Sequence, residues 1–241
     1  MVSGRLPGNV RPVRVHVAFT PGEAAPVPTG IVVDVLRATS TIVQALHSGY
    51  EAVYCCAEIE EAKALEGELG DAVLGGERDG DPIPGFDLGN SPREFLEPRA
   101  RALVLTTTNG TRAIVAAVAD CELILVGSLL NLEAVAAAAA ALGGDVEVVC
   151  AGVQGRYSPD DAYCAGRIVE LLDSERSESA EEAVRVTRSF AGAEEAFRAA
   201  RAVGQPVSEE DLLWCARESV IAAVPQFVGM RGPAAELQHR P

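Results

Sequence analysis

Short runs of β-branched and other apolar residues alternate along this chain with segments in which apolar residues recur every three or four positions. The runs are typical of buried strands, and the second pattern is typical of helices that cover a sheet. Because the connections between these segments are short, we expect a largely parallel or mixed sheet covered on both faces. Strands are predicted over residues 13–19, 29–36, 52–56, 72–75, 102–106, 122–126 and 146–150.

Helical patterns fill the spaces between these strands and dominate the later part of the chain. An apolar piece over 221–228, interrupted by Pro225, is a candidate for a strand at the edge of the sheet. The fold class is therefore α/β with a helical C-terminal third. Helices are predicted over residues 39–48, 58–69, 109–119, 129–142, 160–172, 180–191, 193–203 and 209–215.

The same pattern sets the expected domain limits. Residues 1–12 are predicted to be a loose N-terminal tail, 13–230 a single α/β domain and 231–241 a C-terminal tail. A division into two lobes near 151–158 is the alternative. The long stretch 76–92 is rich in glycine and proline but carries apolar residues, which favours an ordered and functional loop.

Composition excludes several classes of function. The 241 residues carry a formal net charge of −15, which argues against a nucleic-acid partner because a phosphate backbone needs a basic surface. The longest apolar run, over 134–142, is too short to span a membrane, and no signal-peptide pattern precedes it, so we expect a cytoplasmic protein without a membrane partner. The six cysteines lack metal-finger spacing and are expected to be reduced core residues. The alanine-rich helix over 129–142 is suited to packing against a second copy, so a homodimer is one expectation.

Candidate chemistry lies where the predicted strands end, because ligands of parallel α/β sheets bind beyond the carboxyl ends of the strands. The strand over 29–36 runs into Asp34, Arg37 and three consecutive hydroxyl residues, Thr39, Ser40 and Thr41. A carboxylate, a guanidinium and the N–H groups of a helix start suit a site that holds a metal and an anion together. The alternative is a buried strand followed by a surface arginine and an ordinary helix cap.

Similar residues follow the other strands. Carboxylates with hydroxyls suit Mg²⁺, and arginines with helix-start N–H groups suit phosphate or sulfonate oxygens. For each group a structural alternative stays open: a turn and helix cap at 107–111, a solvated ion pair at 77–78, and a helix start that complements the helix dipole at 160–161. The residues are Glu77, Arg78 and Asp81 after the fourth strand, Thr107, Thr108, Asn109, Gly110 and Thr111 after the fifth, Ser128 after the sixth, and Asp160 and Asp161 after the seventh.

Other chemistries do not fit these residues. The chain contains no phosphate-binding G-x-x-x-x-G-K-[ST] loop, no dinucleotide G-x-G-x-x-G after the first strands and no G-x-S-x-G nucleophile motif. A haloacid-dehalogenase-type phosphatase would need a second aspartate two residues after Asp34, where this chain has Leu36.

Several of these runs resemble the 2-phosphosulfolactate phosphatase family, in the order of that family and over about residues 13–230. They are DVLRATST at 34–41, GGER at 75–78, GFDLGNSP at 85–92, TTTNGT at 106–111, GS at 127–128, CAG at 150–152 and DAYCAG at 161–166. The resemblance implies a three-layer α/β/α fold. It also implies Mg²⁺-dependent hydrolysis of (R)-2-phospho-3-sulfolactate to (R)-3-sulfolactate and phosphate, a step towards coenzyme M. The alternatives are a phosphatase of another small 2-phospho acid and a non-catalytic sensor of such a metabolite.

On this reading we assign catalytic roles to Asp34, Arg37 and Glu77. Asp34, Glu77 and Asp161 are expected to hold Mg²⁺, with Asp81 or Asp87 as rival ligands, and Arg37 and Arg78 to clamp the phosphate or the sulfonate. The nucleophile stays open between a metal-held water and Asp34 itself. The remaining contacts to the small anionic substrate are expected from Thr39, Ser40, Thr41, Thr107, Thr108, Asn109, Gly110, Thr111 and Ser128.

Overall fold

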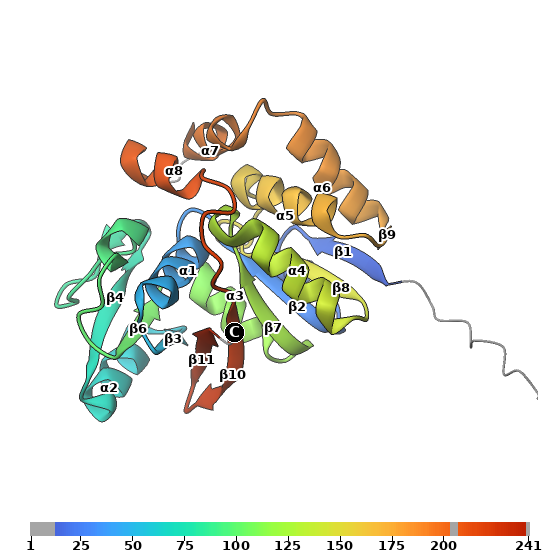
Figure 1. Ribbon diagram of the computed structural model, residues 1–241. Coiled ribbons are helices and arrows are strands. Elements are labelled where there is room, and N and C mark those ends of the chain that lie inside the picture. The colour runs from blue at the N-terminus through green and yellow to red at the C-terminus, as the bar shows by residue number, and fades with distance from the viewer. Residues whose placement is uncertain (1–12, 203–206, 240–241) are drawn as a thin grey trace, which may run out of the picture.

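The computed structural model describes residues 13–202 and 207–239, and a single sheet of eleven strands runs through them (Figure 1). The strands are β1 (Arg14–Ala18), β2 (Val27–Val33), β3 (Ala52–Cys56), β4 (Ala72–Arg78), β5 (Asp81–Pro82), β6 (Ala102–Thr106), β7 (Cys121–Gly127), β8 (Val146–Cys150), β9 (Glu175–Arg176), β10 (Pro225–Arg231) and β11 (Ala234–His239). Their spatial order is β5-β4-β6-β3-β11-β10-β7-β2-β8-β1-β9.

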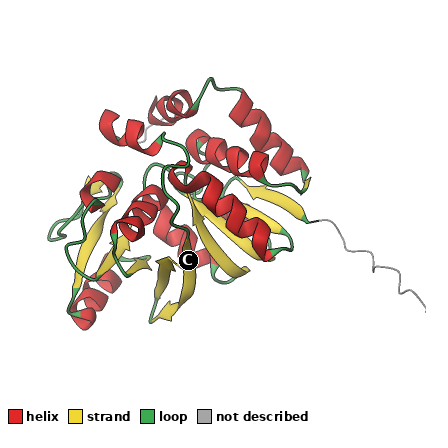
Figure 2. Ribbon diagram, in the orientation of Figure 1, coloured by secondary structure: helices red, strands yellow, loops and turns green. Residues whose placement is uncertain are grey.

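Helices cover both faces of this sheet (Figure 2). The three-layer α/β/α arrangement with a mixed sheet, expected from the sequence, is confirmed. The α-helices are α1 (Ala38–Ser48), α2 (Ile59–Leu69), α3 (Gly110–Ala117), α4 (Leu132–Leu142), α5 (Pro159–Leu171), α6 (Glu178–Arg188), α7 (Ala193–Ala202) and α8 (Glu209–Cys215), and short 3-10 helices lie at Pro21–Glu23, Pro92–Phe95 and Leu129–Asn131.

Strand alternation explains how the layers form. Ile31 and Val33 of β2 pack in a core with α4, α5, α6 and α7, whereas Val32 between them packs in a second core with α1 and α3. Successive strand residues point to opposite faces, so a fully apolar strand requires a helical layer on each side. The first core joins Val15 of β1 to Phe197 of α7, so residues on both sides of segment 151–158 share it.

Apart from β5, which pairs antiparallel with β4, the sheet consists of two parallel halves joined by an antiparallel hairpin, β10–β11. β11 pairs with β3 of the first half, and β10 pairs with β7 of the second half. Seven pairings separate β4 from β8 in the sheet order. Three successive antiparallel pairings, from β3 through the hairpin to β7, make the two halves run in opposite directions along the ladder. At about 20–25° of twist for each pair, the strand direction also turns by roughly 150° between β4 and β8. The twist therefore nearly cancels the reversal, and the carboxyl ends of both halves lie on the same side.

The two expected tails have different outcomes. Residues 1–12 lie outside the described residues. The prediction of a C-terminal tail over 231–241 is wrong for its described part, because Ala234–His239 forms β11 in the interior of the sheet, with Ala235 and Leu237 fully buried. Among the helices of the described residues, none has the length and apolar character needed to cross a membrane.

Candidate active site

A cavity of about 150 Å³ lies where β2, β4, β6 and β8 end, and we call it the first cavity. Four different strand ends therefore contribute to one wall, as the sequence pattern predicted. Its lining residues are Asp34, Leu36, Arg37, Glu77, Asp79, Gly80, Asn90, Thr108, Asn109, Gly152, Val153, Gln154 and Asp161.

Asp34 is held at the junction of β2 and α1. Its Oδ1 accepts a hydrogen bond from the N–H of Ala38 at 3.3 Å, and its own N–H donates to Oγ1 of Thr39 at 3.1 Å. A Cβ atom on Gly110 would lie 2.5 Å from Oδ2 of Asp34, so glycine allows the start of α3 to pack directly against this carboxylate. Oδ2 accepts no hydrogen bond from the described residues, which leaves it available to a ligand.

The environment of Asp34 favours its protonated form. Burial, followed by repulsion from Asp160 and Glu77, raises the pKa of Asp34 from 3.8 to about 7, against the opposing effects of the Ala38 N–H and Arg37. A carboxyl group with a pKa near neutrality is suited to proton transfer at physiological pH.

Glu77 is fixed by three hydrogen bonds. Oε1 accepts from the N–H of Thr108 at 2.7 Å, and Oε2 accepts from the N–H of Gly80 at 2.7 Å and from Oγ1 of Thr108 at 2.9 Å. Because Gly80 follows β4 and Thr108 follows β6, Glu77 joins the two strand ends on its side of the cavity.

Asp161 joins two strand ends on the opposite side of the cavity. Its Oδ1 accepts from the N–H of Val35 and its Oδ2 from the N–H of Gly152, both at 2.9 Å, so it joins the ends of β2 and β8. Burial and the charges of Asp160 and Asp34 raise the pKa of Asp161, although these two hydrogen bonds lower it. Because both carboxylate oxygens accept hydrogen bonds from backbone N–H groups, Asp161 is a structural residue of the site.

Arg37 is oriented by a residue from the helical C-terminal third. Its Nη1 donates to Oδ2 of Asp211 in α8 at 2.7 Å, and the Asp211 side chain is only 4% exposed. Oδ1 of Asp211 accepts from Oγ of Ser91 at 2.5 Å. The Arg37 guanidinium makes no other hydrogen bond to the described residues, so its Nε and Nη2 donors remain for an anion.

A second cavity of about 330 Å³ adjoins the first. Arg37, Glu77, Gly80 and Asn90 line both cavities and form the wall between them. The remaining lining residues come from β4 and the segment after it: Gly76, Pro82, Ile83, Phe86, Asp87, Leu88, Gly89 and Glu94.

The structure brings together six residues of the predicted site in the first cavity: Asp34, Arg37, Glu77, Thr108, Asn109 and Asp161. Asp87 lines the second cavity, where its Oδ2 accepts from the N–H of Leu74. Asp81 is exposed in β5 and lines neither cavity.

Most of the predicted hydroxyl groups lie elsewhere, because they hydrogen-bond within the fold. Thr39 accepts from Asp34, Ser40 donates to the carbonyl of Val35, and Thr41 donates to the carbonyl of Asn90. These hydroxyls therefore shape the wall of the site without lining it. Thr107 and Thr111 likewise hydrogen-bond to each other, and Ser128 hydrogen-bonds to Asn131. Gly110, which has no side chain, packs against Asp34.

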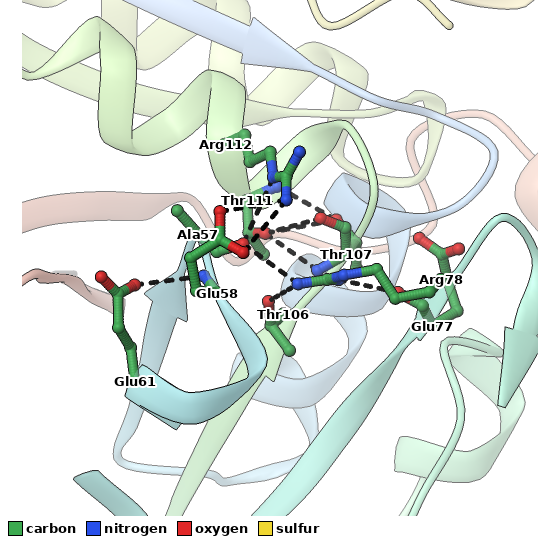
Figure 3. A network of polar contacts seen from close by, with 9 residues as sticks. All are labelled: Ala57, Glu58, Glu61, Glu77, Arg78, Thr106, Thr107, Thr111 and Arg112. Carbon is green, nitrogen blue, oxygen red and sulfur yellow. Dashed lines mark hydrogen bonds and ion pairs between the residues drawn. The ribbon is translucent and has the colours of Figure 1, made fainter. Parts of the chain in front are cut away.

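Arg78 also points away from the cavity. Its guanidinium donates to Oγ1 of Thr106 at 2.7 Å and to the carbonyl of Ala57 at 3.0 Å, beside Arg112 and Glu58 (Figure 3). Arg78 therefore ties β4 to β6 and to the end of β3, whereas Arg37 is the arginine that faces the cavities.

The carboxylates do not form a preassembled metal cage. Within the described residues, no three His, Cys, Asp or Glu side chains form a group that could hold a metal ion. This agrees with the hydrogen bonds that occupy Glu77 and Asp161. The open oxygen of Asp34 still fits Mg²⁺, which commonly uses one or two carboxylates together with water and substrate phosphate.

Sequence reasoning missed four residues around the cavities: Asp79, Asn90, Gln154 and Asp211. Gln154 links two residues that line the first cavity, since its N–H donates to Oδ1 of Asn109 and its Nε2 donates to Oδ1 of Asp79. Asp79 lies two residues after Glu77, and Asn90 lies within the GFDLGNSP run, so both could have been included in the predicted site from the sequence. For Gln154 and Asp211 no local pattern distinguishes them from surface residues.

Comparison with known proteins identifies the family of this chain. The model of a family described as 2-phosphosulpholactate phosphatase matches residues 17–229. A Thermus thermophilus protein named "Probable 2-phosphosulfolactate phosphatase" is 40% identical over 233 residues, covering 92% of this chain and 98% of the relative. The Methanothermobacter thermautotrophicus protein named "2-phosphosulfolactate phosphatase" is 40% identical over 200 residues, 82% and 85% of the two chains. A Clostridium acetobutylicum relative, also named "Probable 2-phosphosulfolactate phosphatase", is 37% identical over 212 residues, 83% and 89% of the two chains. The chain therefore belongs to the 2-phosphosulfolactate phosphatase family.

Proposed function

We propose that this protein hydrolyses (R)-2-phospho-3-sulfolactate to (R)-3-sulfolactate and inorganic phosphate. The observation that carries the proposal is the first cavity, in which the open donors of Arg37 face the same space as the carboxylate of Asp34. This combination suits an anionic phosphate ester whose hydrolysis requires a proton acceptor, and the family names this substrate.

Each residue has a distinct part in the proposed reaction. Arg37 binds anionic oxygens through Nε and Nη2 while Asp211 holds its orientation. Asn109, which directly precedes α3, lines the same cavity, and the N-terminal end of α3 favours negative charge there. Asp34 accepts a proton from the attacking water or attacks phosphorus itself.

We further propose that Mg²⁺ takes part and that Asp34, whose Oδ2 accepts no hydrogen bond from the described residues, would hold it. When bound, Mg²⁺ neutralises charge on phosphoryl oxygens. Glu77, Asp161 and Asp81 are less suited to this role than the sequence indicated, because the oxygens of Glu77 and Asp161 accept hydrogen bonds within the fold and Asp81 lines neither cavity. The role in coenzyme M synthesis, the cytoplasmic location and the homodimer remain predictions from the sequence.

Phosphate release tests the function directly. We expect release from phosphosulfolactate with Mg²⁺, loss of release with EDTA, and much slower release from 2-phospholactate and 2-phosphoglycerate. Comparable rates on all three esters would instead indicate a phosphatase of other 2-phospho acids. Tight binding of phosphosulfolactate without release would indicate a sensor.

The stereochemistry at phosphorus separates the two roles of Asp34. Direct attack by water on a thiophosphoryl ester made chiral with oxygen isotopes gives inversion of configuration. Attack by Asp34, followed by attack of water on the phosphorus of the aspartyl phosphate, comprises two inversions and gives net retention.

A further inference from the structure

The side chain of Asn90 is buried but unpaired in the wall between the two cavities. Asn90 is 5% exposed, and its Oδ1 is buried without a hydrogen-bond partner. Neither Oδ1 nor Nδ2 bonds to any described residue. Two other buried side-chain atoms of the described residues lack partners, on Ser174 and Trp214, but neither residue lines these cavities. An unpaired buried amide weakens a fold, so its presence requires an explanation.

Loose packing of the chain does not explain it, because the backbone around Asn90 is held from three sides. The carbonyl of Asn90 accepts from Oγ1 of Thr41 in α1 at 2.9 Å, and the carbonyl of Gly89 accepts from the N–H of Gly76 at 3.0 Å. Ser91 donates to Asp211. The fold therefore fixes the amide in place while leaving its hydrogen-bonding groups unused.

The same contacts place Asn90 close to Arg37. Asp211 binds Ser91 through Oδ1 and Arg37 through Oδ2, so one carboxylate sets the position of both segments. The unpaired amide and the open guanidinium donors consequently line the same wall.

Resting on the function proposed above, we propose that Asn90, together with Arg37, binds the sulfonate group of the substrate and makes the enzyme selective for a sulfonated 2-phospho acid. The phosphoryl and carboxylate groups of this substrate branch from the same carbon, whereas the sulfonate is one carbon further away. With the phosphoryl group beside Asp34 in the first cavity, the sulfonate reaches the wall shared with the second.

The charges of the second cavity support this placement. Among the described residues that line it, the carboxylates are Glu77, Asp87 and Glu94, and Arg37 is the one cation, so an anion is favoured where the Arg37 guanidinium lies. Sulfonate oxygens accept hydrogen bonds and do not donate them. The amide must therefore present Nδ2, which a half-turn of its planar group allows without a change in volume.

Two variants and two substrates test this inference. Asn90→Asp keeps the volume but replaces the donor with a negative charge, and Asn90→Ala removes the group. We expect kcat/KM for phosphosulfolactate to fall about 100-fold in Asn90→Asp and about 10-fold in Asn90→Ala, mainly through KM. For 2-phospholactate, which lacks the sulfonate, the loss should stay below about 3-fold. Equal losses on both substrates, or no loss, would overturn the inference.

Thermal stability provides a matched control. Asn131 is also a buried asparagine, but its amide is paired, with Oδ1 accepting from Ser128 and Nδ2 donating to the carbonyls of Val126 and Ala223. Asn131→Ala should lower Tm by several degrees without changing the ratio of kcat/KM values for the two substrates. Asn90→Ala should leave Tm unchanged or higher. A drop in Tm in Asn90→Ala as large as in Asn131→Ala would show that the amide is structural.

The same measurements distinguish failure of the proposed function from failure of the proposed role of Asn90. If the wild-type enzyme releases phosphate from neither ester, the function is wrong, and binding of sulfolactate and lactate then tests Asn90 alone. A preference of the wild type for sulfolactate that disappears in Asn90→Asp supports the inference, and an unchanged preference refutes it. If the wild type turns over phosphosulfolactate and Asn90→Asp keeps the same selectivity, only the role of Asn90 fails.

Discussion

Replacing Asp34 with asparagine should stabilise the metal-free protein, and the gain should grow with pH. Asparagine keeps the volume and can still accept the Ala38 N–H, but it carries no charge that Asp160 and Glu77 repel. The pKa of Asp34 is raised from 3.8 to about 7, so between these values the folded state holds a proton that the unfolded state has released. The contribution of Asp34 to wild-type stability therefore falls as pH rises through this window and is constant above it.

The size of this effect follows from the shift. At 1.36 kcal/mol per pKa unit, a rise of about three units corresponds to about 4 kcal/mol between pH 4 and pH 7. Urea unfolding of wild type and Asp34→Asn in EDTA, at half-unit steps from pH 4 to pH 8.5, measures the difference in free energy of unfolding. We expect this difference to increase by about 4 kcal/mol in favour of Asp34→Asn and then to level off.

A control variant and a metal titration make this test specific. Asp81→Asn removes an exposed carboxylate that lines neither cavity, and its unfolding is measured in parallel as the control for removing a carboxylate outside the site. Parallel pH profiles for wild type and Asp34→Asn would refute the reasoning. At pH 8, Mg²⁺ should stabilise the wild type and leave Asp34→Asn unchanged if Asp34 holds the ion.

Three further substitutions test other parts of the site. Arg37→Lys keeps the charge but loses the planar donors, so kcat/KM should fall at least about 100-fold with Tm nearly unchanged, and retention of activity would exclude Arg37 as the anion clamp. Asp211→Asn should raise KM about 10-fold more than it lowers kcat, because it loosens Arg37 without removing it, and steady-state kinetics measure the split. Gly110→Ala should lower the free energy of unfolding by about 1–3 kcal/mol and abolish turnover, since its Cβ would lie 2.5 Å from Asp34. Gly67→Ala in α2, where a Cβ meets no atom within 4 Å, should instead raise stability by roughly 0.5–1 kcal/mol in the same urea assay.

The acids and the arginine at the strand ends were predictable because apolar runs locate strands, and strand ends locate sites in α/β folds. Asp34, Arg37 and Glu77 all follow from this rule. The hydroxyl residues did not follow from it. A threonine in the first turn of a helix can bind a ligand or satisfy the backbone, and in Thr39 and Thr41 the fold uses the second option.

Contacts between distant parts of the chain explain the remaining differences. Asp211 is 174 residues from Arg37 in sequence, and the helical pattern of α8 gives no information about which residue it meets. The hairpin β10–β11 was closer to being predictable, since Gly232 and Pro233, a turn-forming pair, separate the two short segments 225–231 and 234–239. Pro225 obscured this strand, because a proline that interrupts an apolar piece suggests the edge of a sheet, whereas here β10 begins at Pro225 and lies inside the sheet.

The position of β11 has a consequence for how the protein is made. Synthesis proceeds from the N-terminus, so β3 and β7 exist long before the hairpin that joins their halves of the sheet. Until translation has passed residue 239, both strands have an edge without its final partner, and such edges are prone to pair with other chains. Completion of the sheet is thus coupled to the end of β11, and a substitution that slows pairing of Ala235 or Leu237 should reduce the yield of soluble protein more than it reduces the stability of the folded molecule.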